Sequence, residues 1–226
     1  MATAHAFFSA KTLSKLAYVL SLSAVLSFSF NAQAQENFAG HDAAVAQCEA
    51  GNIESCNFLA QNFLNVHQYT EASKYLTTIC YSDTPDALRS CAALTSILTE
   101  PVFGINNYQQ GLKIADYLCS KNGSYGCLLL SDAYFLGTNV SQDLVKASQY
   151  AQKACDLKDP LGCRQLAIIT FSEAYVLKDP KIAQLSFKYH QDACNLGNKD
   201  SCADFAQHNE KLEQFQRFVQ SETPKQ

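Results

Sequence analysis

The sequence lacks the short motifs that mark many catalytic sites. It has no C-x-x-C pair for thiol exchange, no G-x-S-x-G turn and no glycine-rich phosphate loop. Its histidines give no H-x-H or H-E-x-x-H pattern, whereas a catalytic zinc site needs clustered ligands. We therefore predict no metal site and no cofactor. After residue 34, the histidines are His41, His67, His190 and His208.

Long apolar runs are also scarce. The clearest one, residues 16–30, is 15 residues long and contains four serines, whereas roughly 20 apolar residues are needed to cross a bilayer. Lys11 and Lys15 precede it, and a small-x-small pattern ending at Ala34 follows it. These features predict a signal peptide at residues 1–34, cleaved after Ala34. We expect a periplasmic or secreted protein without membrane insertion.

After the predicted cleavage site, the chain has fewer basic residues than acidic ones. The remaining chain carries 15 Lys and Arg residues against 21 Asp and Glu residues, a net charge of −6. No run of Lys and Arg offsets this charge, so phosphate backbones and anionic membranes would be repelled. Nucleic acid is therefore not an expected partner. The length allows one domain with a sizeable core.

Cysteine, in contrast, is abundant and regularly spaced. Four neighbouring pairs have the spacing C-x7-C and one has the spacing C-x10-C. The second cysteines of successive pairs are 35, 36, 36 and 39 residues apart, and a step near 36 is typical of solenoid repeats. The pairs are Cys48–Cys56, Cys80–Cys91, Cys119–Cys127, Cys155–Cys163 and Cys194–Cys202.

The residues around each pair indicate two amphipathic helices separated by a turn. A large apolar residue stands three positions after each second cysteine and a smaller residue stands next to it, as in Leu130 with Ser131 and Leu166 with Ala167. Such a pattern lets neighbouring helices approach closely. Helix breakers, for example Gly123, lie between the two cysteines of a pair.

The turn explains the cysteine spacing. On one continuous helix, Cα atoms eight residues apart would be about 12 Å apart, whereas a disulfide needs less than about 7 Å. A breaker that folds the chain back brings the thiols within reach, and the repeated local spacing favours pairing between neighbours. Two alternatives remain. Buried free thiols suit a cytosolic protein, and the signal peptide argues against that compartment; zinc prefers C-x2-C or Cys/His clusters, which are missing.

One segment carries a specific family resemblance. Residues 133–163, AYFLGTNVSQDLVKASQYAQKACDLKDPLGC, resemble a Sel-like repeat, the tetratricopeptide-related helical hairpin. With its C-x7-C spacing, the chain is similar to the Helicobacter cysteine-rich protein family of exported, disulfide-stapled repeat proteins. The first loop, NVHQYTE, the C-x10-C pair and the fourth loop, VLKDP, depart from the pattern. The matching loop positions are Gly137, Val140, Asp143, Lys146 and Ala147.

The resemblance implies an all-α fold: a right-handed α/α solenoid of Sel-like, TPR-like hairpins over residues 35–206. A capping helix and tail should follow at residues 207–226, with Leu212, Phe215 and Val219 as its apolar stripe. The first helix of each hairpin should line a concave groove, at positions one and five residues past each second cysteine. The competing interpretation is a set of ordinary solvated helix faces. These positions are Asn57, Gln61, Ala92, Ser96, Leu128, Asp132, Arg164 and Ile168.

Different classes of function compete at this point. Stacked hairpins form extended grooves, which predicts a monomeric scaffold that binds proteins or peptides. A secreted factor acting on host cells would use the same groove. The resemblance also implies a penicillin-binding protein or weak β-lactamase, with a β-lactam or peptidoglycan-like ligand. The motifs S-x-x-K, S-D-N and K-T-G of serine β-lactamases are missing, however, so the catalytic residues stay unknown. Asp132 and Glu173 could face one another across the groove, but carboxylates on helices are usually solvated.

Overall fold

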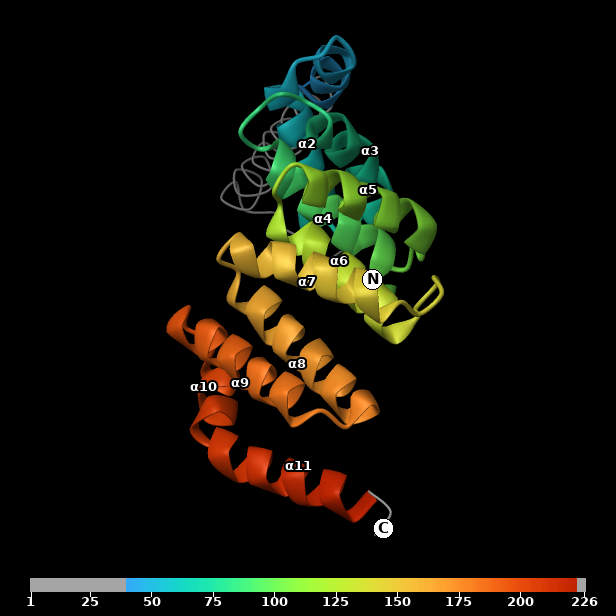
Figure 1. Ribbon diagram of the computed structural model, residues 1–226. Helices are drawn as coiled ribbons and strands as arrows, with labels where there is room; N and C mark the ends of the chain where they lie inside the picture. Colours follow the sequence, from blue (N-terminus) through green and yellow to red (C-terminus); the bar gives the residue numbers. More distant parts are fainter. Residues whose placement is uncertain (1–39, 223–226) are drawn as a thin grey trace, which may run out of the picture. The chain divides into compact units, whose positions relative to one another are not determined.

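A computed structural model describes residues 40–222, which consist of helices joined by short turns (Figure 1). The chain divides into two compact units after Leu59. Residues 40–49 are helical. The helices that follow are α2 (Ile53–Asn65), α3 (Tyr69–Cys80), α4 (Ala87–Thr99), α5 (Tyr108–Ser120), α6 (Ser124–Leu136), α7 (Leu144–Asp156), α8 (Pro160–Leu177), α9 (Pro180–Asn195), α10 (Lys199–Ala206) and α11 (His208–Glu222), with a short 3-10 helix η1 (Pro101–Phe103).

From residue 60 onward, consecutive helices pack against one another in chain order. Contacts join α3 to α4, α4 to α5, and so on through α9 and α10, and Figure 1 shows α6 to α11 stacked in this order. In addition, α4 contacts α6 and α6 contacts α8, so these three helices form one row. This sequential packing defines a solenoid of helical hairpins. The predicted all-α solenoid of disulfide-linked repeats is therefore confirmed.

A disulfide joins the end of one helix to the beginning of the next at each repeat boundary. The paired Cα atoms are 4.4 to 4.8 Å apart, within the range that a disulfide requires. The longer C-x10-C spacing is accommodated by a turn in which the Ser82 hydroxyl donates a hydrogen bond to the carbonyl of Ile79. The bonds are Cys48–Cys56, Cys80–Cys91, Cys119–Cys127, Cys155–Cys163 and Cys194–Cys202.

The loop between α6 and α7 shows why its residue pattern is required. Gly137 ends α6 with φ of +71°, a left-handed conformation that glycine adopts without strain. Val140 packs against the core beneath the loop. Asp143 then begins α7, and its carboxylate accepts a hydrogen bond from the backbone N–H of Lys146 at 3.0 Å. Ala147 is fully buried one turn later.

The fourth loop replaces the glycine yet keeps the same geometry. Lys178 takes the left-handed position at the end of α8, with φ of +53°. Asp179 caps α9 by accepting a hydrogen bond from the N–H of Lys181, and Pro180 occupies the first turn, where no N–H is needed. The departure noted in the sequence therefore changes the residue and not the fold of the loop.

The core repeats the large-and-small pattern seen in the sequence. Leu94, Leu130 and Leu166 are at most 4% exposed. The smaller residue beside each leucine is fully buried, and the Ser131 hydroxyl donates a hydrogen bond to the carbonyl of Ala147 on α7. The Thr95 hydroxyl donates instead to the carbonyl of Cys91 on its own helix, so both buried hydroxyls are satisfied.

Helix α11 closes the described part of the chain at its C-terminal side. It contacts α9, and Phe215 is buried against Ala174 and Ala183. Leu212 and Val219 pack against the same cluster, so the predicted apolar stripe faces the solenoid. The predicted signal peptide, residues 1–34, lies outside the described residues.

Candidate functional site

Two pockets open beside α8 and share one residue, Arg164. The first pocket has a volume of about 290 Å³ and lies between α6 and α8. The second has a volume of about 250 Å³ and extends from α8 to α9, α10 and α11. We call the two together the groove. The first pocket is lined by Tyr125, Leu128, Leu129, Asp132, Leu161, Arg164 and Gln165. The second is lined by Arg164, Ile168, Phe171, Ser172, Ser186, Phe187, His190, Asp204 and Lys211.

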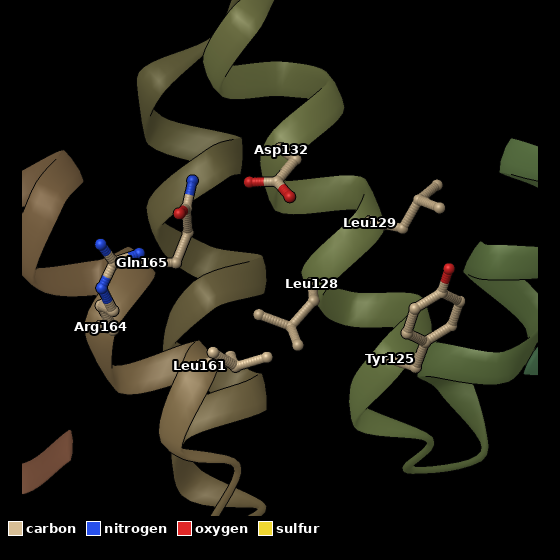
Figure 2. Close-up of a pocket in the computed structure, with 7 residues that line it drawn as sticks. All are labelled: Tyr125, Leu128, Leu129, Asp132, Leu161, Arg164 and Gln165. Carbon is tan, nitrogen blue, oxygen red and sulfur yellow. The ribbon is translucent and has the colours of Figure 1, made fainter. Parts of the chain in front are cut away.

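The first pocket is built from one face of α6 and the equivalent face of α8. Figure 2 shows Leu128 and Leu161 pointing toward one another from the two helices, while Asp132 points toward Gln165. The α6 residues are spaced i, i+3, i+4 and i+7, which is one helical stripe. The disulfide Cys155–Cys163 ties the beginning of α8 to α7, so Arg164, the next residue, projects from a fixed point of the backbone.

The structure brings together half of the predicted groove positions. Leu128 and Asp132 line the first pocket, Ile168 lines the second, and Arg164 lines both. Ser96 reaches the groove indirectly, because its hydroxyl lies 2.7 Å from the Tyr125 hydroxyl.

The remaining positions are not part of the groove. Gln61 is exposed on α2, and Ala92 is half-buried on α4; neither lines one of the two pockets. Asn57 is half-buried and belongs to the residues before the division at Leu59. Glu173 lines a different pocket, on the α7 and α9 side of α8. The suggestion that Asp132 and Glu173 face one another across the groove is therefore wrong.

Hydrogen bonds and burial tune the polar groups of the first pocket. Burial raises the pKa of the Tyr125 hydroxyl, and the Ser96 hydrogen bond partly offsets this effect. Tyr125 also donates a weak hydrogen bond of 3.4 Å to Glu100. Desolvation by the surrounding protein raises the pKa of the Asp132 carboxyl, although this side chain reaches solvent. Both groups are thereby held closer to their neutral forms.

In the second pocket, three charged or titratable side chains form one cluster. The Lys211 ammonium donates to Asp204 at 2.7 Å, and the other oxygen of Asp204 lies 3.9 Å from Nδ1 of His190. Nδ1 of His190 also lies 3.3 Å from the Ser201 hydroxyl. Burial tends to raise the pKa of Asp204, but the hydrogen bond and charge of Lys211, with His190 and Arg164, outweigh it and hold the pKa below its usual value.

His190 should make the stability of the protein depend on pH. Burial lowers its pKa; Asp204 opposes the shift, while Lys211 and Arg164 add to it. The His190 imidazole therefore binds a proton more readily in the unfolded chain than in the folded protein. As the pH falls through the ordinary histidine pKa of 6.5, the free energy of unfolding decreases. We expect the melting temperature to decrease between about pH 7.5 and about pH 5.5, and His190→Gln to flatten that decrease. The other histidines are present in both proteins, so parallel curves would contradict this assignment.

The groove does not assemble a recognisable catalytic set. The Ser172 hydroxyl donates to the carbonyl of Ile168 and the Ser186 hydroxyl to that of Ala183, so neither is paired with a base. Lys211 is already bound to Asp204. Within residues 40–222, His, Cys, Asp and Glu side chains nowhere gather in a group that could hold a metal ion. β-Lactam hydrolysis stays a prediction that rests on the resemblance alone.

The compartment is constrained by the cysteines. All ten form disulfides, which is consistent with an oxidising, extracytoplasmic environment. None of the helices in residues 40–222 has both the length and the apolar character of a membrane span.

Comparison with known proteins supports the fold. A Sel1 repeat protein from Oxalobacter formigenes superposes with a TM-score of 0.52 and 22% sequence identity, over 68% of this chain and 59% of that chain. The chain has the Sel1-repeat fold. It is also similar to Helicobacter pylori cysteine-rich protein B, with a TM-score of 0.45 and 28% identity over 60% of this chain and 93% of the other. No family model matches, and no curated protein matches significantly.

Several residues that line the groove were not predicted from the sequence. Tyr125 and Leu161 stand two positions before the second cysteine, and Leu129 and Gln165 stand two positions after it. Extending the predicted face by one helical turn would have found all four. His190, Asp204 and Lys211 come from three other helices, and no spacing in the sequence links them to α8.

Proposed function

We propose that this Sel1-repeat scaffold binds an extended segment of another protein, or a peptide, in the groove. The main support is the arrangement of the two pockets, which meet at Arg164. Each pocket combines apolar side chains with a few polar groups, as ligand sites usually do. Five disulfides favour an exported protein, so the partner would be met in the periplasm or outside the cell.

The size and shape of the pockets favour side chains of a peptide over one compact ligand. Pockets for drug-sized molecules usually measure about 300 to 1,000 Å³, and the two pockets here, of about 290 and 250 Å³, lie near the lower end of this range. Two small pockets that share Arg164 suit two side chains of one extended chain, whose residues are spaced about 3.3 Å apart. One ligand of this kind can occupy both pockets.

The apolar walls set a scale for the affinity. Leu128, Leu129 and Leu161 line the first pocket, while Phe171 and Phe187 line the second. Burying one apolar side chain in each pocket would contribute about 3 to 6 kcal/mol in total. Micromolar binding needs about 8 kcal/mol after the costs of association. Polar contacts along the groove must therefore supply the remainder.

Selection of peptides from a random library against the oxidised protein tests the proposal. We expect selected peptides to bind with micromolar affinity and Leu128→Glu to weaken them by more than about tenfold, because it puts a charge in the apolar wall. Lys113→Glu, on the exposed side of α5, is the control and should leave the affinity unchanged. Fluorescence anisotropy of labelled peptides measures both. Failure to select any peptide, or peptides that bind Leu128→Glu normally, would overturn the proposal.

A further inference from the structure

Arg164 lies at the junction of the two pockets, and its charge acts on Asp204 and His190 without an ion pair between them. Its Nε is buried and has no hydrogen bond. Over residues 40–222 the structure shows no ion pair for its guanidinium, although six other Lys and Arg side chains form one with an acid. An arginine in such a position is normally held by a carboxylate, because its planar fork matches two carboxylate oxygens.

The nearest acids do not fill this role. Asp204 is engaged by Lys211 and lies near His190. Asp132 points toward Gln165, and Figure 2 shows the Arg164 guanidinium on the other side of Gln165. The second pocket therefore has two cations, Arg164 and Lys211, and one carboxylate, while burial favours the neutral form of His190. The lining of the second pocket therefore has one more cation than carboxylate.

A segment that occupies both pockets must pass over Arg164, since this residue lines each of them. The segment would then remove water from the guanidinium. Burying a charge without a partner is costly, so a ligand that fits the groove should bring an acceptor to this point. A carboxylate is the best acceptor, because it forms two charge-assisted hydrogen bonds at once.

From this charge imbalance, and on the basis of the proposed function, we propose that the groove recognises an extended peptide with an acidic side chain between two apolar ones. The acidic side chain pairs with Arg164, and the apolar side chains enter the two pockets. A C-terminal carboxylate fits less well, because a chain that ends at Arg164 leaves one pocket empty. Asp or Glu in the interior of the segment satisfies both pockets and the cation.

Matched peptides and variants test the charge pairing. In a selected peptide, replacing the acidic residue by its amide (Asp→Asn or Glu→Gln) should weaken binding to the parent protein about tenfold. The same replacement should change binding to Arg164→Gln by less than about twofold, because the partner charge is gone. Lys113→Gln is the matched control and should retain the tenfold difference. A peptide with Lys at the acidic position should bind Arg164→Glu better than it binds the parent.

The outcomes separate this inference from the proposed function. If peptides bind in a Leu128-dependent manner but the acid-to-amide change has the same effect in the parent and in Arg164→Gln, the acidic specificity is wrong and the groove function stands. If the preferred acid is the C-terminal carboxylate, so that amidation of the C-terminus and not of the side chain removes binding, the interior position is wrong. If no peptide binds the groove, both proposals fail.

Discussion

Reduction of the five disulfides should unfold the protein at temperatures where the oxidised form stays folded. Each bond closes a short loop, and the chain-entropy account gives such a loop about 2.5 kcal/mol of stabilisation. Five bonds would then contribute at most about 12 kcal/mol, which is comparable with the whole stability of an ordinary domain. Far-UV circular dichroism during heating, with and without reductant after prior unfolding, measures the difference. A melting temperature that is unchanged by reduction would contradict this account.

A single bond can be tested at Cys119–Cys127, because both cysteines are buried. We expect the double variant Cys119→Ala with Cys127→Ala to lower the free energy of unfolding by about 2.5 kcal/mol. Alanine leaves no unpaired polar group, so the helices should remain intact. Cys119→Ala alone should cost at least as much, since the bond is lost and a free thiol stays buried. Urea unfolding of the three proteins gives the values, and a double variant as stable as the parent would show that the bond does not stabilise the fold.

The fold could be predicted because its information is local and repeated. The spacing of the cysteines gave the repeat length, and the turn between them required the chain to reverse. The residues that end one helix and begin the next could also be predicted where the loop follows the common pattern, as with Gly137 and Asp143. Lys178 stands where the common loop pattern has glycine. The next helix still begins directly after it, because Asp179 caps that helix and Pro180 suits its first turn. Local signals thus overlap, and one of them can be lost.

The site could be predicted only in part, because it combines several helices. The positions Leu128, Asp132, Arg164 and Ile168 on α6 and α8 follow from the resemblance to Sel-like repeats, which places residues one and five positions past each second cysteine on the concave side. The partners in the second pocket depend on how α9, α10 and α11 fold back toward α8. Whether Arg164 finds an acid within the protein is likewise a property of the packing. Sequence spacing gives no information on such contacts.

Gly162→Ala should destabilise the protein by about 2 kcal/mol, even though alanine favours helices over glycine by up to about 1 kcal/mol. The first turn of α8 crosses the end of α7 so closely that a Cβ on Gly162 would lie 2.6 Å from the Cβ of Ala154 and 2.6 Å from the backbone nitrogen of Cys155. Ordinary contacts between such atoms begin at about 3.5 Å. None of the atoms it meets is the end of a flexible side chain, so the helices must separate, and overpacking of this kind usually costs about 1 to 3 kcal/mol.

The other repeats and an open glycine provide the controls. In three other repeats, the position equivalent to Gly162 is a serine: Ser55, Ser90 or Ser201. The helix crossings in those repeats already accommodate a Cβ, so Ser90→Ala should have little effect. Gly40→Ala should be neutral or slightly stabilising, because no atom lies within 4 Å of its added Cβ. For Gly162→Ala we expect a fall of roughly 4 to 8 °C in melting temperature. A variant that melts at or above the parent temperature would mean that α7 and α8 can separate at no cost, and that the close crossing beside the disulfide is not required by the repeat.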